Sequence, residues 1–184
     1  MFEAFKTRAE GVGAEVHRVA TREEALLFVR WFLETERINE SPGSGALWAK
    51  SALLDGVPES EIPRHPGLSH DVSRDRAAQA KLGISEAQWG VADTGSLVLD
   101  QGAPEQRLVS SLPTIHLALL PTGNILAGKA QVFEKMNPAT SKYIAFITGP
   151  SRTADIERVL TIGVHGPERL VIVCIDDVEG GPYE

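Results

Sequence analysis

Two short apolar runs constrain the fold of this chain more than any other feature. They span Ile115 to Leu120 (IHLALL) and Leu170 to Ile175 (LVIVCI), and most of their residues are Val, Ile or Leu. Short runs without strict alternation are typical of strands buried on both faces of a parallel sheet. A third segment, Ala14 to Val19 (AEVHRV), alternates apolar with polar residues, as a half-buried strand does.

A capped helix is predicted directly after this third segment. Thr21 is followed three residues later by Glu24, which is the capping-box pattern of a helix N-terminus. The helix runs to about Glu36, and a wide apolar stripe predicts that it packs on the sheet. Strands that alternate with helices in this way predict an α/β fold with a mainly parallel sheet covered on both faces. Further helical patterns lie at Met1 to Glu10 and Lys129 to Pro138.

The sequence between Ser73 and Leu99 predicts a short helix followed by a β-hairpin. The helix begins at Ser73 or Asp75, passes through Ala77, Ala80 and Leu82, and ends at Gly83. Two short strands, Trp89 to Ala92 and Ser96 to Leu99, follow it. The turn between them is Asp93-Thr94-Gly95, in which Gly95 tolerates a positive φ. Gln101 to Arg107 is a polar loop.

The segment from Val57 to Arg74 is the longest without a periodic pattern, and we expect a functional or mobile loop there. His65 and His70, with Asp71 and Asp75 nearby, could suggest a metal site. Their spacing matches no established ligand set, so we predict no metal.

Length and charge limit the function classes. The chain has 184 residues, which fits one domain, and its charge is 18 minus 25, or −7. This acidic balance argues against nucleic-acid binding. No apolar run approaches the ~20 residues of a membrane span, and the N-terminus lacks a signal-peptide core, so we expect a cytoplasmic protein. The single cysteine, Cys174, cannot form an internal disulfide or build a cluster site.

The segment from Tyr143 to Glu157 (YIAFITGPSRTADIE) is the candidate binding site. It predicts a buried strand, a tight turn at 148–151, and a helix that begins near Ser151 or Thr153 with Asp155 in its first turn. Free N–H groups at a helix start, with Arg152 beside them, would seat a carboxylate or phosphate. Ordinary α/β architecture that binds nothing explains the same pattern.

Two histidines are candidates for chemistry. His165 lies between two glycines (GVHGP), on a bend that can present a side chain. His116 lies inside an apolar strand, where a histidine is more often a satisfied core residue than a catalyst, although burial shifts its pKa.

The motifs Thr148 to Glu157 (TGPSRTADIE) and Gly163 to Pro167 (GVHGP) resemble the LUD, or lactate-utilisation, domain family, in particular its short LutC-like members. Ala92 to Leu97 (ADTGSL) and Leu112 to His116 (LPTIH) support the resemblance. Family members usually carry Glu-Thr-Gly where this chain has Asp93-Thr94-Gly95, and often an acidic residue where Gln88 stands.

The resemblance implies a Rossmann-like three-layer sandwich similar to ribose-phosphate isomerases and CoA transferases. It implies a single LUD-type domain over residues 1–184, with the loop at about 57–74 and a flexible acidic tail at about 177–184. It also implies a component of a three-protein system that oxidises L-lactate to pyruvate. The iron–sulfur clusters are then expected on an iron–sulfur LUD-domain sister protein and a cysteine-rich oxidoreductase subunit, with none bound by this chain.

The expected site follows from the motifs and the resemblance together. His165, Asp93 and His116 are the catalytic candidates. The ligand-binding candidates are Thr94, Gly95, Thr148, Gly149, Ser151, Arg152, Thr153 and Asp155. Two alternatives stay open, namely a non-catalytic scaffold for the iron–sulfur partners and an enzyme of the CoA or sugar-phosphate type.

Overall fold

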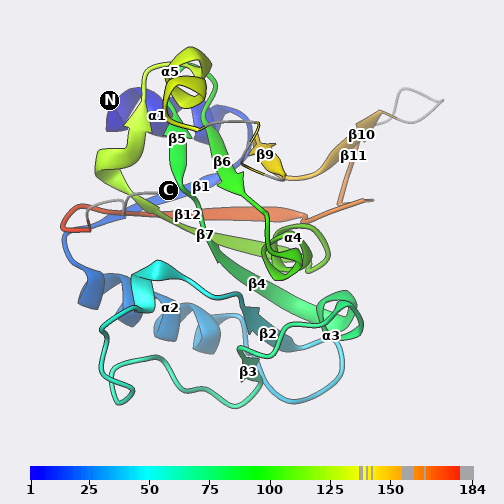
Figure 1. The fold of residues 1–184 in the computed structure, drawn as a ribbon. Helices are drawn as coiled ribbons and strands as arrows, with labels where there is room; N and C mark the ends of the chain where they lie inside the picture. The colour runs from blue at the N-terminus through cyan, green and yellow to red at the C-terminus, as the bar shows by residue number, and fades with distance from the viewer. Residues whose placement is uncertain (137–138, 140, 142, 155–159, 164, 179–184) are drawn as a thin grey trace.

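A six-stranded parallel sheet forms the middle of the molecule (Figure 1). The structure, a computed structural model, describes residues 1–136, 139, 141, 143–154, 160–163 and 165–178. In spatial order the strands are β1 (Glu15–Val19), β12 (Arg169–Ile175), β7 (Ile115–Pro121), β4 (Ala80–Glu86), β2 (Gly45–Trp48) and β3 (Leu68–Ser69). Every residue of β7 is buried, and β12 is buried from Leu170 onward. The prediction of a mainly parallel sheet with two fully buried strands is therefore confirmed.

Two layers cover the two apolar faces of this sheet, which gives three layers in all. On one face, α2 (Arg22–Thr35) buries its apolar stripe against alternate residues of β4, β7 and β12. On the other face, α1 (Phe2–Gly11) and a second, smaller sheet cover the remaining residues of β7 and β12. Figure 1 shows α2 below the main sheet and the smaller sheet above it. The arrangement is the predicted Rossmann-like α/β sandwich.

The smaller sheet contains the predicted hairpin. Its strands, in order, are β8 (Ile125–Leu126), β5 (Trp89–Val91), β6 (Ser96–Asp100) and β9 (Ile144–Ile147). Gly95 has φ +66° in the turn between β5 and β6, and a Cβ there would lie 2.3 Å from the Ala9 backbone nitrogen. The turn therefore needs glycine both for its conformation and for the close approach of α1. On its outer face the sheet carries α5 (Lys129–Lys135).

The capping-box prediction for α2 is also confirmed. The Thr21 hydroxyl accepts a hydrogen bond from the Glu24 N–H at 3.2 Å. The Glu24 carboxylate accepts one from the Ala20 N–H at 2.8 Å. Both bonds satisfy backbone donors that the helix itself cannot pair.

The predicted helix over 73–83 is wrong in its second half. Ser73 caps α3 (Arg74–Gln79) as expected, but the chain then enters β4 at Ala80. A Cβ on Gly83 would lie 1.8 Å from the Val109 carbonyl oxygen. This glycine therefore lets α4 (Pro104–Ser111) lie directly on the sheet. Helix α4 was itself missed, because its first residues read as a polar loop.

The predicted helix after the 148–151 turn is also wrong. The chain forms β10 (Arg152–Ala154), which pairs in antiparallel fashion with β11 (Leu160–Ile162). The strand before the turn, β9, is half-buried and lies at the edge of the smaller sheet. Residues 155–159, where Asp155 falls, and the tail residues 179–184 lie outside the described residues.

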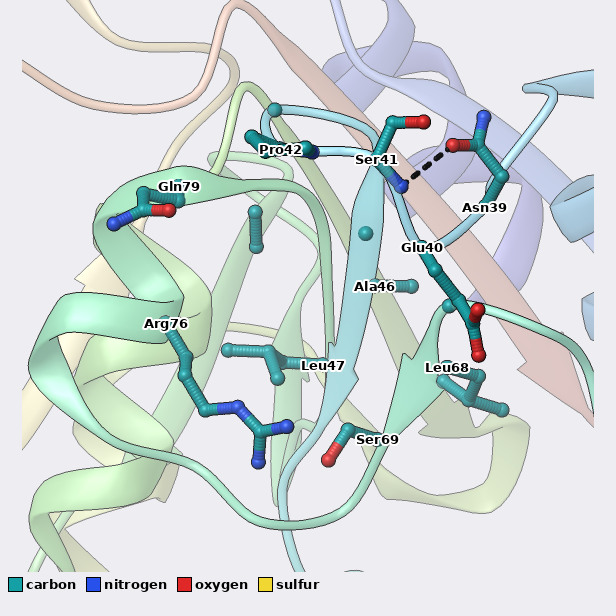
Figure 2. Close-up of a pocket in the computed structure, with 14 residues that line it drawn as sticks. Asn39, Glu40, Ser41, Pro42, Ala46, Leu47, Leu68, Ser69, Arg76 and Gln79 are labelled. Carbon is teal, nitrogen blue, oxygen red and sulfur yellow. Dashed lines mark hydrogen bonds between the residues drawn. The ribbon is translucent and has the colours of Figure 1, made fainter.

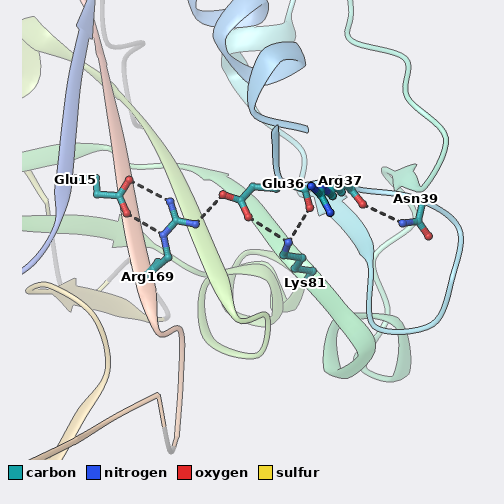
Figure 3. Close-up of polar contacts among 6 residues, drawn as sticks. All are labelled: Glu15, Glu36, Arg37, Asn39, Lys81 and Arg169. Atoms are coloured by element: carbon teal, nitrogen blue, oxygen red, sulfur yellow. Dashed lines mark hydrogen bonds and ion pairs between the residues drawn. The ribbon is translucent and has the colours of Figure 1, made fainter. Parts of the chain in front are cut away.

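An ion network ties together the beginnings of three parallel strands (Figure 3). Arg169 donates to Glu15 through Nε at 2.8 Å and to Glu36 through Nη1 at 2.7 Å. Lys81 Nζ lies 3.1 Å from the second Glu36 oxygen. Burial by itself would raise the pKa of Glu36, but the hydrogen bonds from Arg169 and Lys81 outweigh it, so the pKa lies below its ordinary value. Glu36 thus links β12 to β4 from the end of α2.

Replacing Glu36 with Gln should destabilise the fold by about 1–3 kcal/mol, because Arg169 and Lys81 lose the charge between them. Since the folded-state pKa of Glu36 is depressed, its contribution is complete above its ordinary pKa and is lost as the pH falls through the folded value. Urea unfolding at pH 7 measures the loss. The control Glu34→Gln removes an exposed carboxylate of the same helix and should change the free energy of unfolding by less than about 0.5 kcal/mol. Equal effects of the two substitutions would contradict a role for the network.

Candidate functional site

A cavity of about 400 Å³ lies where β7 and β12 begin. His116 and Leu170, the second residues of these strands, line its inner side. The chain from Ala145 to Arg152 lines a second side, and α4 contributes Ser110 and Ser111. Six residues predicted for the site line this cavity, namely His116, Thr148, Gly149, Ser151, Arg152 and His165. The fold thus brings together motifs that are up to 50 residues apart in the sequence (165 − 116 = 49).

A chain of three hydroxyl groups connects the cavity with the turn before β6. Thr148 Oγ1 lies 2.7 Å from Ser96 Oγ, and Ser96 Oγ lies 2.7 Å from Thr94 Oγ1. Ser96 is buried, so each of its hydrogen bonds contributes in a site without competing water. Thr94, a predicted ligand residue, therefore reaches the cavity only through Ser96 and Thr148.

His116 is buried, with 1% of its surface exposed. Its Nε2 lies 2.8 Å from Ser85 Oγ, and Nδ1 is buried without a hydrogen-bond partner among the described residues. Burial lowers the pKa of His116 to about 4, so the ring is neutral at pH 7. A neutral ring whose pKa is this low is a weaker base than an ordinary histidine, but it can still accept or donate one hydrogen bond.

Arg152 is exposed, and one of its Nη atoms donates to the Val12 carbonyl oxygen. A Cβ on Gly13 would lie 2.8 Å from that Nη2 atom, so the guanidinium packs directly on the α1–β1 connection. This contact holds Arg152 at the cavity's rim, and within the described part of the chain no other hydrogen bond or ion pair uses its guanidinium.

The predicted seat of free helix-start amides does not exist. The Ser151 N–H donates to the Pro167 carbonyl oxygen at 2.9 Å, and Arg152 belongs to a strand. Gly166 packs closely on Ser151, because a Cβ at 166 would lie 3.0 Å from the Ser151 Cβ. His165, exposed beside this contact, lines the same cavity.

Other predicted residues lie elsewhere. Asp93 is exposed near the start of α5, where its Oδ2 lies 3.3 Å from the position of a Cβ on Gly128. Gly95 packs on α1. Neither lines the cavity. Thr153 lies in β10, and Asp155 lies outside the described residues.

Three residues of the site carried no signal in the sequence. Ser85 holds His116, as described above. Gln101 lines the cavity and donates from Nε2 to Ser110 Oγ at 2.6 Å. Ser85 contacts His116 from β4, while Gln101 and Ser110 line the cavity from the end of β6 and from α4, so only the packing of those elements reveals them.

A second hollow, of about 490 Å³, lies at the other edge of the main sheet (Figure 2). The turn from Asn39 to Gly45, the edge strand β3, and α3 surround it. Its cation, Arg76, is already paired with Asp71, whose Oδ2 lies 2.6 Å from Nη1. None of the predicted site residues lines this hollow.

The described part of the chain offers few side chains that could bind a metal ion or a redox cofactor. Cys174 is fully buried in β12, and burial raises the pKa of its thiol to about 12. Across the described residues, no cluster of three or more His, Cys, Asp and Glu side chains could hold a metal ion. In the same residues, no helix is long and apolar enough to cross a membrane.

The sequence profile of the LUD domain matches residues 2–175. The chain belongs to the LUD domain family. Its predicted membership is thereby confirmed. A crystal structure of a DUF162 family protein from Deinococcus radiodurans has the same fold as this LUD domain, with a TM-score of 0.62 over 95% of both chains at 18% identity.

Several curated relatives of this LUD domain carry the name Lactate utilization protein C. The protein of that name from Bacillus subtilis is 32% identical over 144 residues, which are 75% of this chain and 59% of the relative. The one from Halalkalibacterium halodurans is 36% identical over 109 residues, or 56% and 47%. An Escherichia coli protein, YkgG, is 38% identical over 108 residues. The LUD domain thus spans about half the length of the relatives it matches.

The pH dependence of stability tests the burial of His116 in this LUD domain. Its pKa is about 4 folded and 6.5 unfolded, so the unfolded chain binds the proton first as the pH falls. The free energy of unfolding should therefore decline between pH 6.5 and 4, by up to ~1.4 kcal/mol per pH unit from this group. The substitution His116→Gln should make that decline shallower in urea unfolding series. The exposed control His165→Gln should keep the wild-type slope, and parallel curves for wild type and His116→Gln would contradict the assignment.

Proposed function

We propose that this LUD domain is a component of L-lactate utilisation and that its cavity binds a small carboxylate. The relatives named Lactate utilization protein C support the first part. The convergence of six predicted residues on one cavity carries the second. Its described lining contains Arg152, two histidines and several hydroxyl groups, and none of those lining residues is Asp or Glu. Such a set of groups favours an anion.

In this proposal each group has a role that its position allows. Arg152 holds the carboxylate with the N–H groups that Val12 does not occupy. The hydroxyl of Thr148 contacts the ligand's oxygen atoms, with Ser96 fixing its orientation. His165, which is exposed at the cavity, accepts the proton of the ligand's hydroxyl group, since an imidazole nitrogen can act as a general base. The neutral ring of His116 supplies a hydrogen bond.

Oxidation of L-lactate to pyruvate removes two electrons and two protons. The LUD domain's one cysteine is fully buried in β12, so a partner protein would receive the electrons. We propose that this partner is an iron–sulfur LUD-domain protein acting with a cysteine-rich oxidoreductase subunit. This chain would then bind and orient the acid, and the partners would carry the redox groups.

Calorimetric titration of the chain with L-lactate, pyruvate and inorganic phosphate tests the proposed site. We expect at least one carboxylate to bind, and we expect Arg152→Ala and His165→Ala each to weaken binding by about tenfold or more. The control Arg64→Ala removes an exposed arginine whose one ion-pair partner among the described residues is the exposed Glu59, and this variant should bind as the wild type does. Wild-type affinity in both cavity variants, each checked for its fold by circular dichroism, would exclude this site.

A scaffold without catalysis is the second candidate, and the free edge of β9 described below favours it. Pull-down with the iron–sulfur partners, set beside ligand titration, separates the two candidates. Partner binding without any small-molecule ligand supports the scaffold. Chemistry on CoA or sugar phosphates rests on fold likeness alone, and a fold does not specify a reaction.

A further inference from the structure

The backbone of β9 presents hydrogen-bonding groups away from its sheet. Among the residues that the structure describes, β9 pairs with β6 alone, in antiparallel fashion, and is the last strand of the smaller sheet. The Gln101 N–H donates to the Tyr143 carbonyl oxygen at 2.8 Å, which fixes the phase of the ladder. Alternate residues of an antiparallel strand point their backbone groups to the same side. Ala145 and Ile147 therefore bond to β6, and the N–H and C=O groups of Ile144 and Phe146 point outward.

The neighbouring strand confirms this phase independently. Val98 lies opposite Phe146, and its carbonyl oxygen accepts from the Gln88 N–H at 3.0 Å. Asp100 lies opposite Ile144, and its N–H donates to the Gln88 side chain at 2.6 Å. Both residues of β6 thus turn their backbone groups toward β5. Within the described part of the chain, no hydrogen bond uses the outward groups of Ile144 or Phe146.

The cavity runs along this free edge. Ala145, Phe146 and Ile147 all line it, although successive side chains of a strand point to opposite faces. The Ile147 side chain packs toward the main sheet, whereas the Phe146 ring packs under α5, 6.0 Å from the Phe133 ring. The cavity therefore borders β9 mainly on the face that Tyr143, Ala145 and Ile147 share, and it reaches the backbone of the strand at Phe146. In Figure 1, β9 lies beside β6 at the border of the smaller sheet.

The charges along this groove favour an acidic occupant. At one end of the lining segment, the Arg107 guanidinium stacks on the Tyr143 ring at 5.0 Å. At the other end lies Arg152. No described lining residue is Asp or Glu, although the chain as a whole carries a charge of −7. Opposite charges raise association rates and select partners.

We infer that the free edge of β9 docks an extended, acidic segment of a partner protein, which adds a strand to the smaller sheet. The outward N–H and C=O groups of Ile144 and Phe146 pair with the backbone of that segment. Arg107 and Arg152 contact its acidic side chains. This surface goes beyond the binding of a small acid, because it is built from backbone groups that the proposed ligand site does not use.

Amide hydrogen exchange of the wild-type chain tests the docking strand directly. The probe is a blocked ten-residue peptide in which Val or Thr alternates with Glu, and the control peptide carries Lys in place of Glu. In the free protein the Ile144 and Phe146 amides should exchange fast, whereas those of Ala145 and Ile147 are protected by the ladder. The Glu peptide should slow the first pair, and the Lys peptide should do so at least about tenfold more weakly. No added protection at about 1 mM peptide, or equal protection by both peptides, would overturn the inference.

A pair of variants isolates the backbone donor. Phe146→Pro removes the outward N–H and leaves the ladder bonds of β9 in place, and proline is tolerated at such edge positions. Phe146→Val also removes the ring but keeps the N–H. The proline variant should bind the Glu peptide at least about tenfold more weakly than the valine variant. Equal affinities would overturn the inference. If the proline variant does not fold, the exchange measurement on the wild type decides.

Two further measurements distinguish this inference from dimerisation through the same edge and from the binding of a small acid. Sedimentation of the wild type detects a second copy on the same edge, and dimerisation that Phe146→Pro abolishes would replace the partner segment by that copy. Calorimetry with L-lactate, as described above, reports on the small-acid site. Loss of lactate binding in His165→Ala should leave the protection of Ile144 and Phe146 by the Glu peptide unchanged, because the docking edge does not use His165, so the two proposals fail separately.

Discussion

The parallel pairing of β7 with β12 is the interaction on which the rest of the structure depends. The two strands pair over seven residues, from Ile115 opposite Arg169 to Pro121 opposite Ile175, and their side chains face apolar layers on both sides. Burial of such strands removes apolar surface from water on two faces at once. The same pairing brings His116 beside Leu170, and this position defines the inner side of the cavity. The stability of the fold and the location of the site therefore have one origin.

Local sequence patterns correctly predicted two kinds of element. These are the helix whose cap and apolar stripe lie within one segment, and the strands that are buried on both faces. The Thr21 cap and the apolar stripe of α2 are contained within one segment, as are the runs that form β7 and β12. β4 was misread because Gly83 resembles a helix stop, although its role is to let the Val109 backbone approach the sheet. The helix expected after Ser151 had a capping residue and acidic residues in its first turn. The antiparallel pairing of Arg152 with Ile162 overrides that pattern, and the local sequence contains nothing that predicts this pairing.

The sequence predicted those residues of the candidate site that belong to recognisable motifs. Thr148, Arg152 and His165 lie in two motifs that the sequence shows, and the fold brings them to one cavity with His116. Asp93 belongs to a similar motif, yet it lies exposed near α5, because the hairpin turn points away from the cavity. Ser85 and Gln101 have no motif, since they enter the site only through the packing of β4 and β6. A residue's presence in a motif therefore did not by itself place it in the cavity.

The close contact between Gly83 and Val109 also determines how the cavity can respond to an occupant. With no room for even one methyl group between them, α4 cannot approach the sheet further, and Ser110 and Ser111 keep a constant height above β4. The opposite boundary is β9, which pairs with a single strand among the described residues. Narrowing of the pocket therefore cannot come from α4, and β9 is the boundary that can move inward. A small guest would register as a displacement of β9 toward α4.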